Sequence, residues 1–295
     1  MLSILIPTYN YNVYPLVLEL HKQCLECQIE FEILVQDDAS KSELNLENEK
    51  INLVSNCHFF CAETNLGRGE NRNSLANRAH HNWFLFLDCD TFPTDSNFIK
   101  NYIEVIVQCK PNVIYGGLAY KNEKPKKEEI LRWVYGKKRE AKSIEERKRN
   151  PSFALTSNLA ILSEVFCEIK FDSSIKNYGY EDLIFISELE KNNIQIEQID
   201  NCVYHLNLEN SEHFLEKTEI ALRTLHTISK NDLYKTETQV TKYYSQIKRY
   251  KIDLFLLFIF RKFKRVLKKN LLSNNPSLFV FDLYKLGFFT EISNY

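Results

Sequence analysis

Glycine is scarce in this chain, with only seven among 295 residues and none before Gly67. The first apolar run therefore ends without the glycine-rich loop and basic residue by which a sugar nucleotidyltransferase would bind phosphates. Paired acids do follow a later apolar run, and a nucleotidyltransferase also binds its nucleotide near paired acids. This enzyme class therefore stays an alternative. An excess of one charge is also lacking, because the formal net charge is −1. A balanced charge argues against a protein built chiefly to bind nucleic acid.

Long apolar runs are lacking as well. The longest near the C-terminus, residues 254–260, is far shorter than the roughly 20 residues of a membrane span. The first residues have neither the basic region nor the apolar length of a signal peptide. The eight cysteines need not form disulfides in a chain this long, and Cys24 and Cys27 continue the apolar face of a predicted helix, which favours buried thiols over a zinc site. We expect a cytoplasmic protein with reduced thiols.

Short apolar runs alternate with amphipathic segments through the first half of the chain. The runs predict strands at residues 2–6, 31–35, 59–61 and 83–87, and helices at 15–27 and 69–79. A sheet-like pattern resumes over 153–162 and 194–204, with a strand at 198–204, and helical spacing returns over 211–229. Such alternation predicts an α/β fold, with a Rossmann-like, mostly parallel sheet and helices on both faces.

The same pattern divides the chain. Residues 1–205 form the predicted catalytic domain, and residues 206–295 form a helical C-terminal extension. A charged excursion over 121–150 interrupts the first domain, and its apolar content is too thin for a core element, so we expect a mobile or helical segment.

Polar side chains follow the predicted strands at the point where each strand ends. Parallel strands bring their carboxyl ends to one edge of a sheet, so residues 8–10, 37–38 and 88–90 should gather there. Asp88 and Asp90 could bind Mg²⁺ or Mn²⁺, which prefer oxygen ligands. A capped turn with two solvated acids is the alternative. His205 is either an ordinary half-buried histidine or a further metal ligand.

Two helix starts carry further candidates. Gly67 and Gly69 open one helix beside Arg68 and Arg72, where N–H groups and charge suit a diphosphate, although an ordinary helix cap explains the pattern equally well. The acidic pair Glu181 and Asp182 opens another helix. The helix dipole favours acids there, and a general base is the functional interpretation.

Taken together, these motifs resemble the family 2 glycosyltransferases of the GT-A fold in order and spacing over residues 1–205. Residues 156–182 also resemble the acceptor half of galactosyltransferase-type members, except that Tyr180 stands where a second glycine is usual. The resemblance implies an inverting transferase that uses Mn²⁺ or Mg²⁺ and a nucleotide sugar, by default a UDP-sugar. A glycan or lipid-linked glycan in cell-surface polysaccharide synthesis would be the acceptor.

The resemblance also implies roles for individual residues. The nucleotide sugar would be bound by Pro7, Thr8, Tyr9, Asp37, Asp38, Asn65, Gly67, Arg68, Arg72 and Asp88. Asp90, Asp88 and His205 would hold the metal, Asp182 would be the catalytic base, and Glu181, Asn158 and Tyr180 would bind the acceptor. A non-catalytic glycan- or nucleotide-binding module remains an alternative, which the intact acids disfavour.

A basic amphipathic segment at residues 253–269 lies outside these motifs. Large apolar side chains come first, and six Lys or Arg residues follow within 261–269. An interfacial helix on the anionic inner face of the cytoplasmic membrane has this composition. A packed helix with a solvated basic face has it equally, and both interpretations stay open.

Overall fold

The computed structural model describes residues 1–109, 111–150, 152–176, 178–230 and 238–294. They form two compact units. The first comprises Met1–Tyr120, Glu140–Lys176 and Glu181–Asn207, and the second comprises Lys121–Arg139, Asn177–Tyr180 and Leu208–Tyr295. The division predicted near residue 205 differs in that two short segments, 121–139 and 177–180, group with the C-terminal helices.

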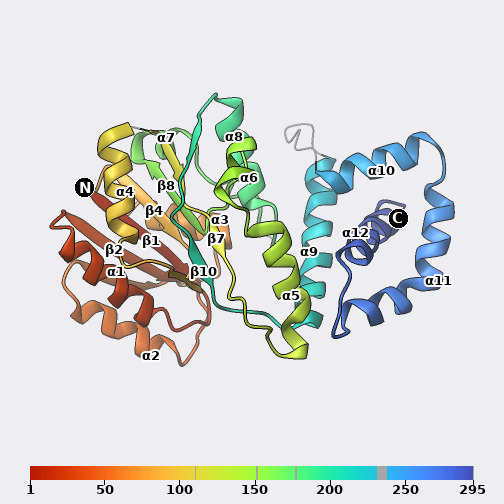
Figure 1. Cartoon of the computed structure of the whole chain (residues 1–295), viewed down its shortest axis with the longest axis horizontal. Coiled ribbons are helices and arrows are strands. Elements are labelled where there is room, and N and C mark those ends of the chain that lie inside the picture. The colour runs from red at the N-terminus through yellow and green to blue at the C-terminus, as the bar shows by residue number, and fades with distance from the viewer. Residues whose placement is uncertain (110, 151, 177, 231–237, 295) are drawn as a thin grey trace. The chain divides into compact units, whose positions relative to one another are not determined.

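A seven-stranded sheet forms the centre of the first unit (Figure 1). Its order is β3 (Cys57–Cys61), β2 (Phe31–Asp37), β1 (Leu2–Thr8), β4 (Trp83–Leu87), β8 (Asn158–Leu162), β6 (Val113–Tyr115) and β9 (Ile196–Gln198). The four strands from the N-terminal part are parallel, and β8 runs antiparallel to both β4 and β6. The predicted α/β class with a mostly parallel sheet is confirmed.

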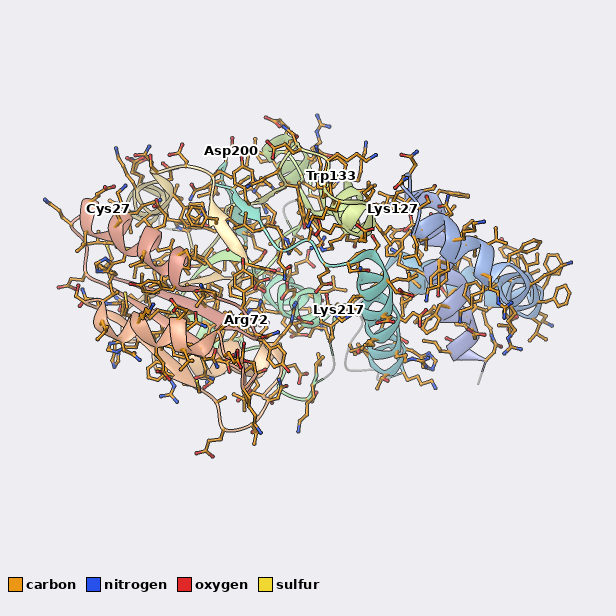
Figure 2. All side chains as sticks on the ribbon, turned by 90° about the horizontal axis from the view of Figure 1, so that it is seen from below. Cys27, Arg72, Lys127, Trp133, Asp200 and Lys217 are labelled. Carbon is orange, nitrogen blue, oxygen red and sulfur yellow. The ribbon has the colours of Figure 1, made fainter. Side chains whose placement is uncertain are left out.

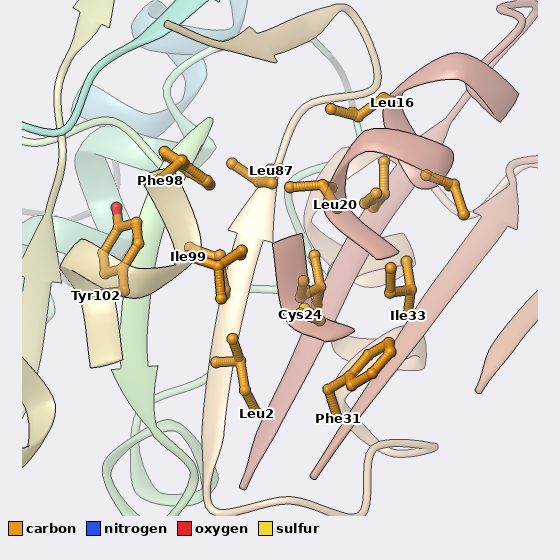
Figure 3. Packing of buried hydrophobic residues seen from close by; sticks show 14 of the residues in the cluster. Leu2, Leu16, Leu20, Cys24, Phe31, Ile33, Leu87, Phe98, Ile99 and Tyr102 are labelled. Carbon is orange, nitrogen blue, oxygen red and sulfur yellow. The ribbon is translucent and has the colours of Figure 1, made fainter. Parts of the chain in front are cut away.

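Alternating side chains of the strands fill a core on each face of the sheet. On one face, Leu2 and Ile4 of β1 pack with α1 (Tyr14–Glu26) and α4 (Phe98–Cys109). Leu20 and Cys24 of α1 are fully buried there (Figure 3), whereas Cys27 just after the helix is only partly buried. The prediction of buried thiols at Cys24 and Cys27 therefore holds for Cys24 alone. On the other face, Leu5 packs with α3 (Arg68–Ala76), α7 (Ser163–Glu168) and α8 (Glu181–Lys191). Successive side chains of β1 point to opposite faces of the sheet, so each face has an apolar surface that helices cover.

The strand predicted over residues 198–204 is wrong in extent. β9 ends at Gln198, and a separate strand, β10 (Val203–His205), lies in a second sheet between β5 (Thr91–Pro93) and β7 (Leu118–Ala119). His205 pairs with Thr91 in this small sheet. The small sheet therefore connects the end of β10 to the turn that follows β4.

The charged excursion is helical. It contains η2 (Lys127–Glu129), α5 (Ile130–Tyr135), a π-helical turn η3 (Gly136–Glu140) and α6 (Ile144–Arg149). In the second unit, Trp133 Nε1 donates a hydrogen bond to the Lys121 carbonyl over 2.8 Å, and Figure 2 labels Lys127 and Trp133 on this segment.

The rest of the described second unit is largely helical and includes α9 (Ser211–Ser229), α10 (Gln239–Arg249), α11 (Asp253–Leu271) and α12 (Leu278–Ser293). Phe260, Phe281, Tyr284 and Phe288 are buried in its core. Within the described ranges, none of the helices combines the length and apolar character that crossing a bilayer requires.

Candidate active site

The turn after β2 is built by its own two acids. Asp37 accepts hydrogen bonds from the Ser40 amide (2.8 Å) and hydroxyl (2.6 Å). Asp38 accepts the amides of Leu66 (2.6 Å) and Gly67 (3.0 Å). Burial raises the pKa of Asp38, an effect that these two amides oppose and that Asp37 increases. Both carboxylates therefore shape loops at the edge where the nucleotide sugar was predicted to bind.

The loop before α3 is held against that edge. Asn65 donates its side-chain amide to the Asp38 carbonyl (3.0 Å). Gly67 precedes the helix with φ +84°, a conformation that favours glycine, and an added Cβ would lie 3.2 Å from the Lys176 carbonyl oxygen. Gly67 is thus required by its backbone conformation and by this close approach. The loop directs the N-terminus of α3 toward the ends of the central strands.

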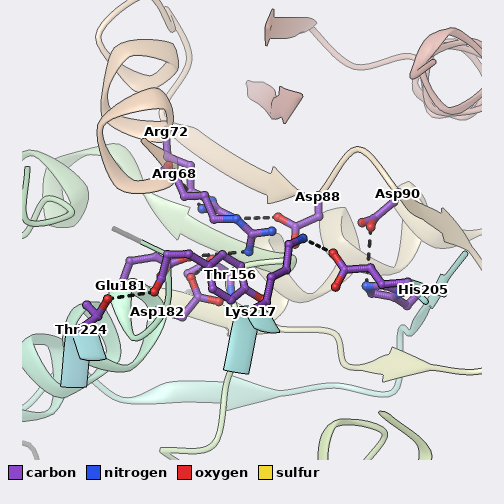
Figure 4. A network of polar contacts seen from close by, with 12 residues as sticks. Arg68, Arg72, Asp88, Asp90, Thr156, Glu181, Asp182, His205, Lys217 and Thr224 are labelled. Atoms are coloured by element: carbon purple, nitrogen blue, oxygen red, sulfur yellow. Dashed lines mark hydrogen bonds and ion pairs between the residues drawn. The ribbon is translucent and has the colours of Figure 1, made fainter. Parts of the chain in front are cut away.

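Arg72 and Asp88 form the central ion pair. Arg72 Nη2 donates to Asp88 Oδ1 over 2.6 Å, and the arginine side chain is only 2% exposed (Figure 4). Burial alone would raise the pKa of Asp88, but the charges of Arg72, Arg68 and His205 and the hydrogen bond hold it below its usual value. Asp88 is therefore an anion that fixes Arg72 in place, which sequence spacing alone did not suggest.

Asp182 lies at the start of α8 and is held from the segment before β8. Thr156 Oγ1 donates to Asp182 Oδ1 over 2.5 Å, and the Thr156 amide donates to Oδ2 over 3.4 Å (Figure 4). Burial raises the pKa of Asp182, and the neighbouring Glu181 and Asp88 add to the effect, while Arg72 and the Thr156 bond oppose it. A carboxylate with a raised pKa near a fixed arginine has the properties of a general base.

Glu181 joins the same group through Arg68. Their charged atoms are 3.6 Å apart, with Glu181 buried and Arg68 about half exposed. The two arginines of α3 thus face two acids of α8 and the acid after β4. Residues that are far apart in sequence supply alternating charges at one end of the sheet.

Asp90 and His205 form a second, adjacent pair, with Oδ2 and Nε2 3.6 Å apart. Tyr120 stacks on the imidazole with ring centroids 5.4 Å apart, and its hydroxyl bonds to Glu140. Among the described residues, no group of three His, Cys, Asp or Glu side chains is arranged to hold a metal ion. The Asp90 carboxylate is of the ligand type that Mn²⁺ and Mg²⁺ prefer, and substrate phosphates and water commonly complete such coordination.

The three residues predicted to bind the donor at the end of β1 differ in their exposure to solvent. Pro7 and Thr8 belong to the strand, and Thr8 is buried, with its hydroxyl 3.5 Å from the Tyr11 carbonyl. Tyr9 is 59% exposed just beyond the strand. Tyr9 is the member of this group that is accessible for contact with a planar base.

Asn158 is fully buried at the start of β8. Its amide donates to the carbonyls of Gly117 (2.8 Å) and Asn201 (2.9 Å), and its oxygen accepts the Tyr102 hydroxyl (2.7 Å). All its polar atoms are thus used within the core. Asn158 supports the strand ends, whereas the resemblance implied contact with the acceptor.

Arg147 was missed by the sequence analysis. It is 1% exposed on α6 and donates to the carbonyls of Tyr115 (3.2 Å), Gly116 (3.3 Å) and Ile199 (2.9 Å). Its position in a run of exposed charges concealed it, and the signal nearby is the Ser143 capping box that starts α6. Thr156, the partner of Asp182, was missed as a functional residue too.

Tyr180 belongs to the second unit, where it packs against the helical core. Its φ is +71°, in the region that favours glycine. The usual glycine at this place in the resembling enzymes therefore has a backbone reason. Gly179 is similarly constrained, because a Cβ there would lie 2.5 Å from that of Ala221.

Known proteins resemble this chain in sequence and in fold. The sequence model described as "Glycosyl transferase family 2" matches residues 3–169, more than half of the chain. An "Uncharacterized glycosyltransferase" of Haemophilus influenzae is 35% identical over 94 residues, which cover 30% of this chain and 29% of that protein. The chain thus spans less than a third of this relative.

Two solved structures are similar in fold. TarS 1–349 of S. aureus has a TM-score of 0.53 at 22% identity, over 79% of this chain and 66% of that one. The mannosyltransferase PcManGT of Pyrobaculum calidifontis, solved with GDP-Man and Mn²⁺, has a TM-score of 0.55 at 12% identity, over 78% and 64%. At these identities the likeness shows the fold. The family match itself includes Arg72, Asp88 and Asp90 and ends before Asp182.

Proposed function

Because the chain belongs to glycosyl transferase family 2, we propose that it transfers a sugar from a nucleoside-diphosphate donor to an acceptor hydroxyl, with inversion at the anomeric carbon. One observation carries the proposal. Asp182, with a raised pKa, is fixed by Thr156 beside the ion pair that the buried Arg72 forms with Asp88. Family membership favours transfer of a sugar over the nucleotidyltransferase alternative.

In this mechanism the chain's own residues act on both sides of the sugar. Asp182 accepts the proton of the attacking hydroxyl as the new glycosidic bond forms. Direct attack from that face inverts the anomeric centre, so one base suffices. Arg72 and Arg68 supply positive charge for the diphosphate, whose negative charge grows as it leaves. Glu181 and Tyr180 are assigned to the acceptor, and Asn158 supports the strand ends.

The donor is assigned to the loops at the ends of β1, β2 and β4. Tyr9 would contact the base, while Asp38 and Asn65 hold the loop that brings Gly67 and α3 to the phosphates. A UDP-sugar is the expected donor, since TarS has been solved with UDP and with UDP-GlcNAc. A glycan or lipid-linked glycan in cell-surface polysaccharide synthesis is the proposed acceptor.

A divalent cation belongs to the proposal. Asp90 and His205 would hold Mn²⁺ or Mg²⁺, with Asp88 beside them, and PcManGT was solved with Mn²⁺. When bound, the cation would neutralise charge on the departing diphosphate. Because Asp88 pairs with Arg72, we assign most of the metal binding to Asp90 and His205.

A cytoplasmic location completes the proposal. Cys24, Cys27, Cys57, Cys61, Cys89, Cys167 and Cys202 are free thiols, which suits a reducing compartment.

A thermal-shift screen of UDP- and GDP-sugars, each with and without Mn²⁺, tests this function. A ligand that binds only the folded state raises the melting temperature. We expect at least one donor to raise it, and more strongly with Mn²⁺ than without. A donor that binds without any sugar release in the presence of candidate acceptors would instead support the non-catalytic module.

A further inference from the structure

Helix α11 exposes large apolar side chains over its first two turns. Leu254, Phe255 and Phe258 are 68%, 66% and 65% exposed. At about 100° per residue these positions share one side of the helix with Lys262, Arg265 and Lys269, which are also exposed. We call these six residues the α11 face. It is apolar in its N-terminal half and basic in its C-terminal half.

The opposite side of α11 is well packed, so the exposed face does not reflect a loose helix. Leu257, Phe260 and Leu271 are buried in the core of the second unit. Gly287 of α12 allows Phe260 to approach closely, because a Cβ there would lie 2.2 Å from its ring. The helix is thus anchored on one side and presents the α11 face outward.

The surrounding charge is strongly positive. Residues 239–294 contain eleven Lys or Arg and three Asp or Glu, a formal charge of +8 in a chain whose total is −1. All three acids are in ion pairs: Asp253 with Lys248 (3.1 Å), Asp282 with Arg139 (2.6 Å), and Glu291 with Lys264 (2.9 Å). Among the described residues, no acid pairs with Lys262, Arg265 or Lys269.

We propose that the α11 face binds an anionic membrane surface. Leu254, Phe255 and Phe258 would enter the boundary between headgroups and acyl chains, and the three cations would contact lipid phosphates. Exposed aromatic and aliphatic residues beside Lys and Arg are the composition of interfacial helices. A second copy is a poorer occupant, because two faces of the same positive charge repel each other.

This inference rests on the proposed function only for its purpose, since a membrane site would bring the enzyme to a lipid-linked acceptor. Binding itself requires neither donor nor acceptor. Vesicle binding and donor binding can therefore fail independently of each other.

Sedimentation of the full chain with vesicles tests the proposal. Vesicles of phosphatidylcholine alone are compared with vesicles that also contain phosphatidylglycerol, at low and high salt. We expect binding to the anionic vesicles that weakens with salt, because the screening length shortens. The variant K262E/R265E/K269E and the variant F255Q/F258Q should each reduce the partition coefficient at least about tenfold.

Matched controls change similar residues elsewhere. K41E/K148E/R149E reverses three exposed charges of the first unit, and L46Q/L53Q replaces two of its exposed apolar residues. Both should bind vesicles like the parent. The proposal would be overturned if all four variants bound vesicles equally, or if the parent bound neutral and anionic vesicles equally. It would also be overturned if RNA or a second copy of the chain, and not lipid, covered the α11 face. Circular dichroism establishes that each variant is folded.

Discussion

Thr156 donates its hydroxyl to Asp182 across 2.5 Å, which joins the segment before β8 to the first turn of α8. The bond stabilises the ionised carboxylate, whereas burial and two nearby acids favour the protonated form. The proposed base thus has a raised pKa, which the charge of Arg72 and this hydroxyl limit. This relationship leads directly to a pH-dependent prediction.

The variant Thr156→Val should move the acidic limb of the kcat/KM profile to higher pH. The base acts when deprotonated, so activity falls as the pH drops through the pKa of Asp182. Removing a bond that lowers this pKa raises it further, and activity is then lost at a higher pH. Thr156→Ser retains the hydroxyl and should keep the parent profile. Identical acidic limbs for the Val and Ser variants would contradict the assignment.

The Arg72–Asp88 pair should show strong coupling in a double-mutant cycle. Removing one partner leaves the other charge poorly solvated, at a cost of about 3–5 kcal/mol for buried pairs. Asp88 is 25% exposed, so we expect about 2 kcal/mol for Arg72→Met or Asp88→Asn, and a coupling energy of about 1–2 kcal/mol. Urea unfolding measures these energies. The exposed Lys22–Glu26 pair should couple by less than about 0.5 kcal/mol.

Arg147→Met should destabilise the first unit without a direct effect on donor chemistry. The buried guanidinium is the donor to three backbone carbonyls at the ends of β6 and β9, and methionine supplies no donor. We expect a loss of about 3 kcal/mol in the free energy of unfolding. Arg149→Met, on the exposed part of the same helix, should change it by less than about 0.5 kcal/mol. Equal effects of the two substitutions would exclude a special role for Arg147.

Tyr120 should act as a positioning residue for His205. Tyr120→Leu removes the ring that stacks on the imidazole, and we expect Mn²⁺ affinity in the presence of UDP to fall about tenfold. Tyr120→Phe keeps the ring and should retain most of the affinity. Isothermal titration with Mn²⁺ measures both. Unchanged affinity in the Leu variant would remove Tyr120 from the metal site.

The sequence predicted the N-terminal half of the sheet well because each strand there is a short apolar run that ends at a polar turn. β4 begins and ends where residues 83–87 predicted it. Local pattern does not encode pairing between distant segments, so the antiparallel insertion of β8 and the division of 198–204 between two sheets were not predicted.

The site was predictable where a side chain follows a strand or opens a helix. The site was less predictable where the same residue type can either bind a ligand or stabilise the fold. Asp37 and Asp38 have the sequence context of ligand-binding acids, and the structure uses them to hold Ser40 and the amides before α3. Arg147 has the context of a solvated charge and is buried. Side-chain direction decides such cases, and it depends on tertiary contacts.

The most direct test of the central claim is the rate of sugar transfer by Asp182→Asn, measured beside donor binding in the same variant. Release of the nucleoside diphosphate from the donor identified by thermal shift reports the transfer, and isothermal titration reports the binding. Loss of a general base should lower kcat by about 10²–10⁴-fold, while donor affinity stays within about twofold. Glu190→Gln, an exposed acid on the same helix, should retain full activity. A kcat close to that of the parent in Asp182→Asn would contradict the account.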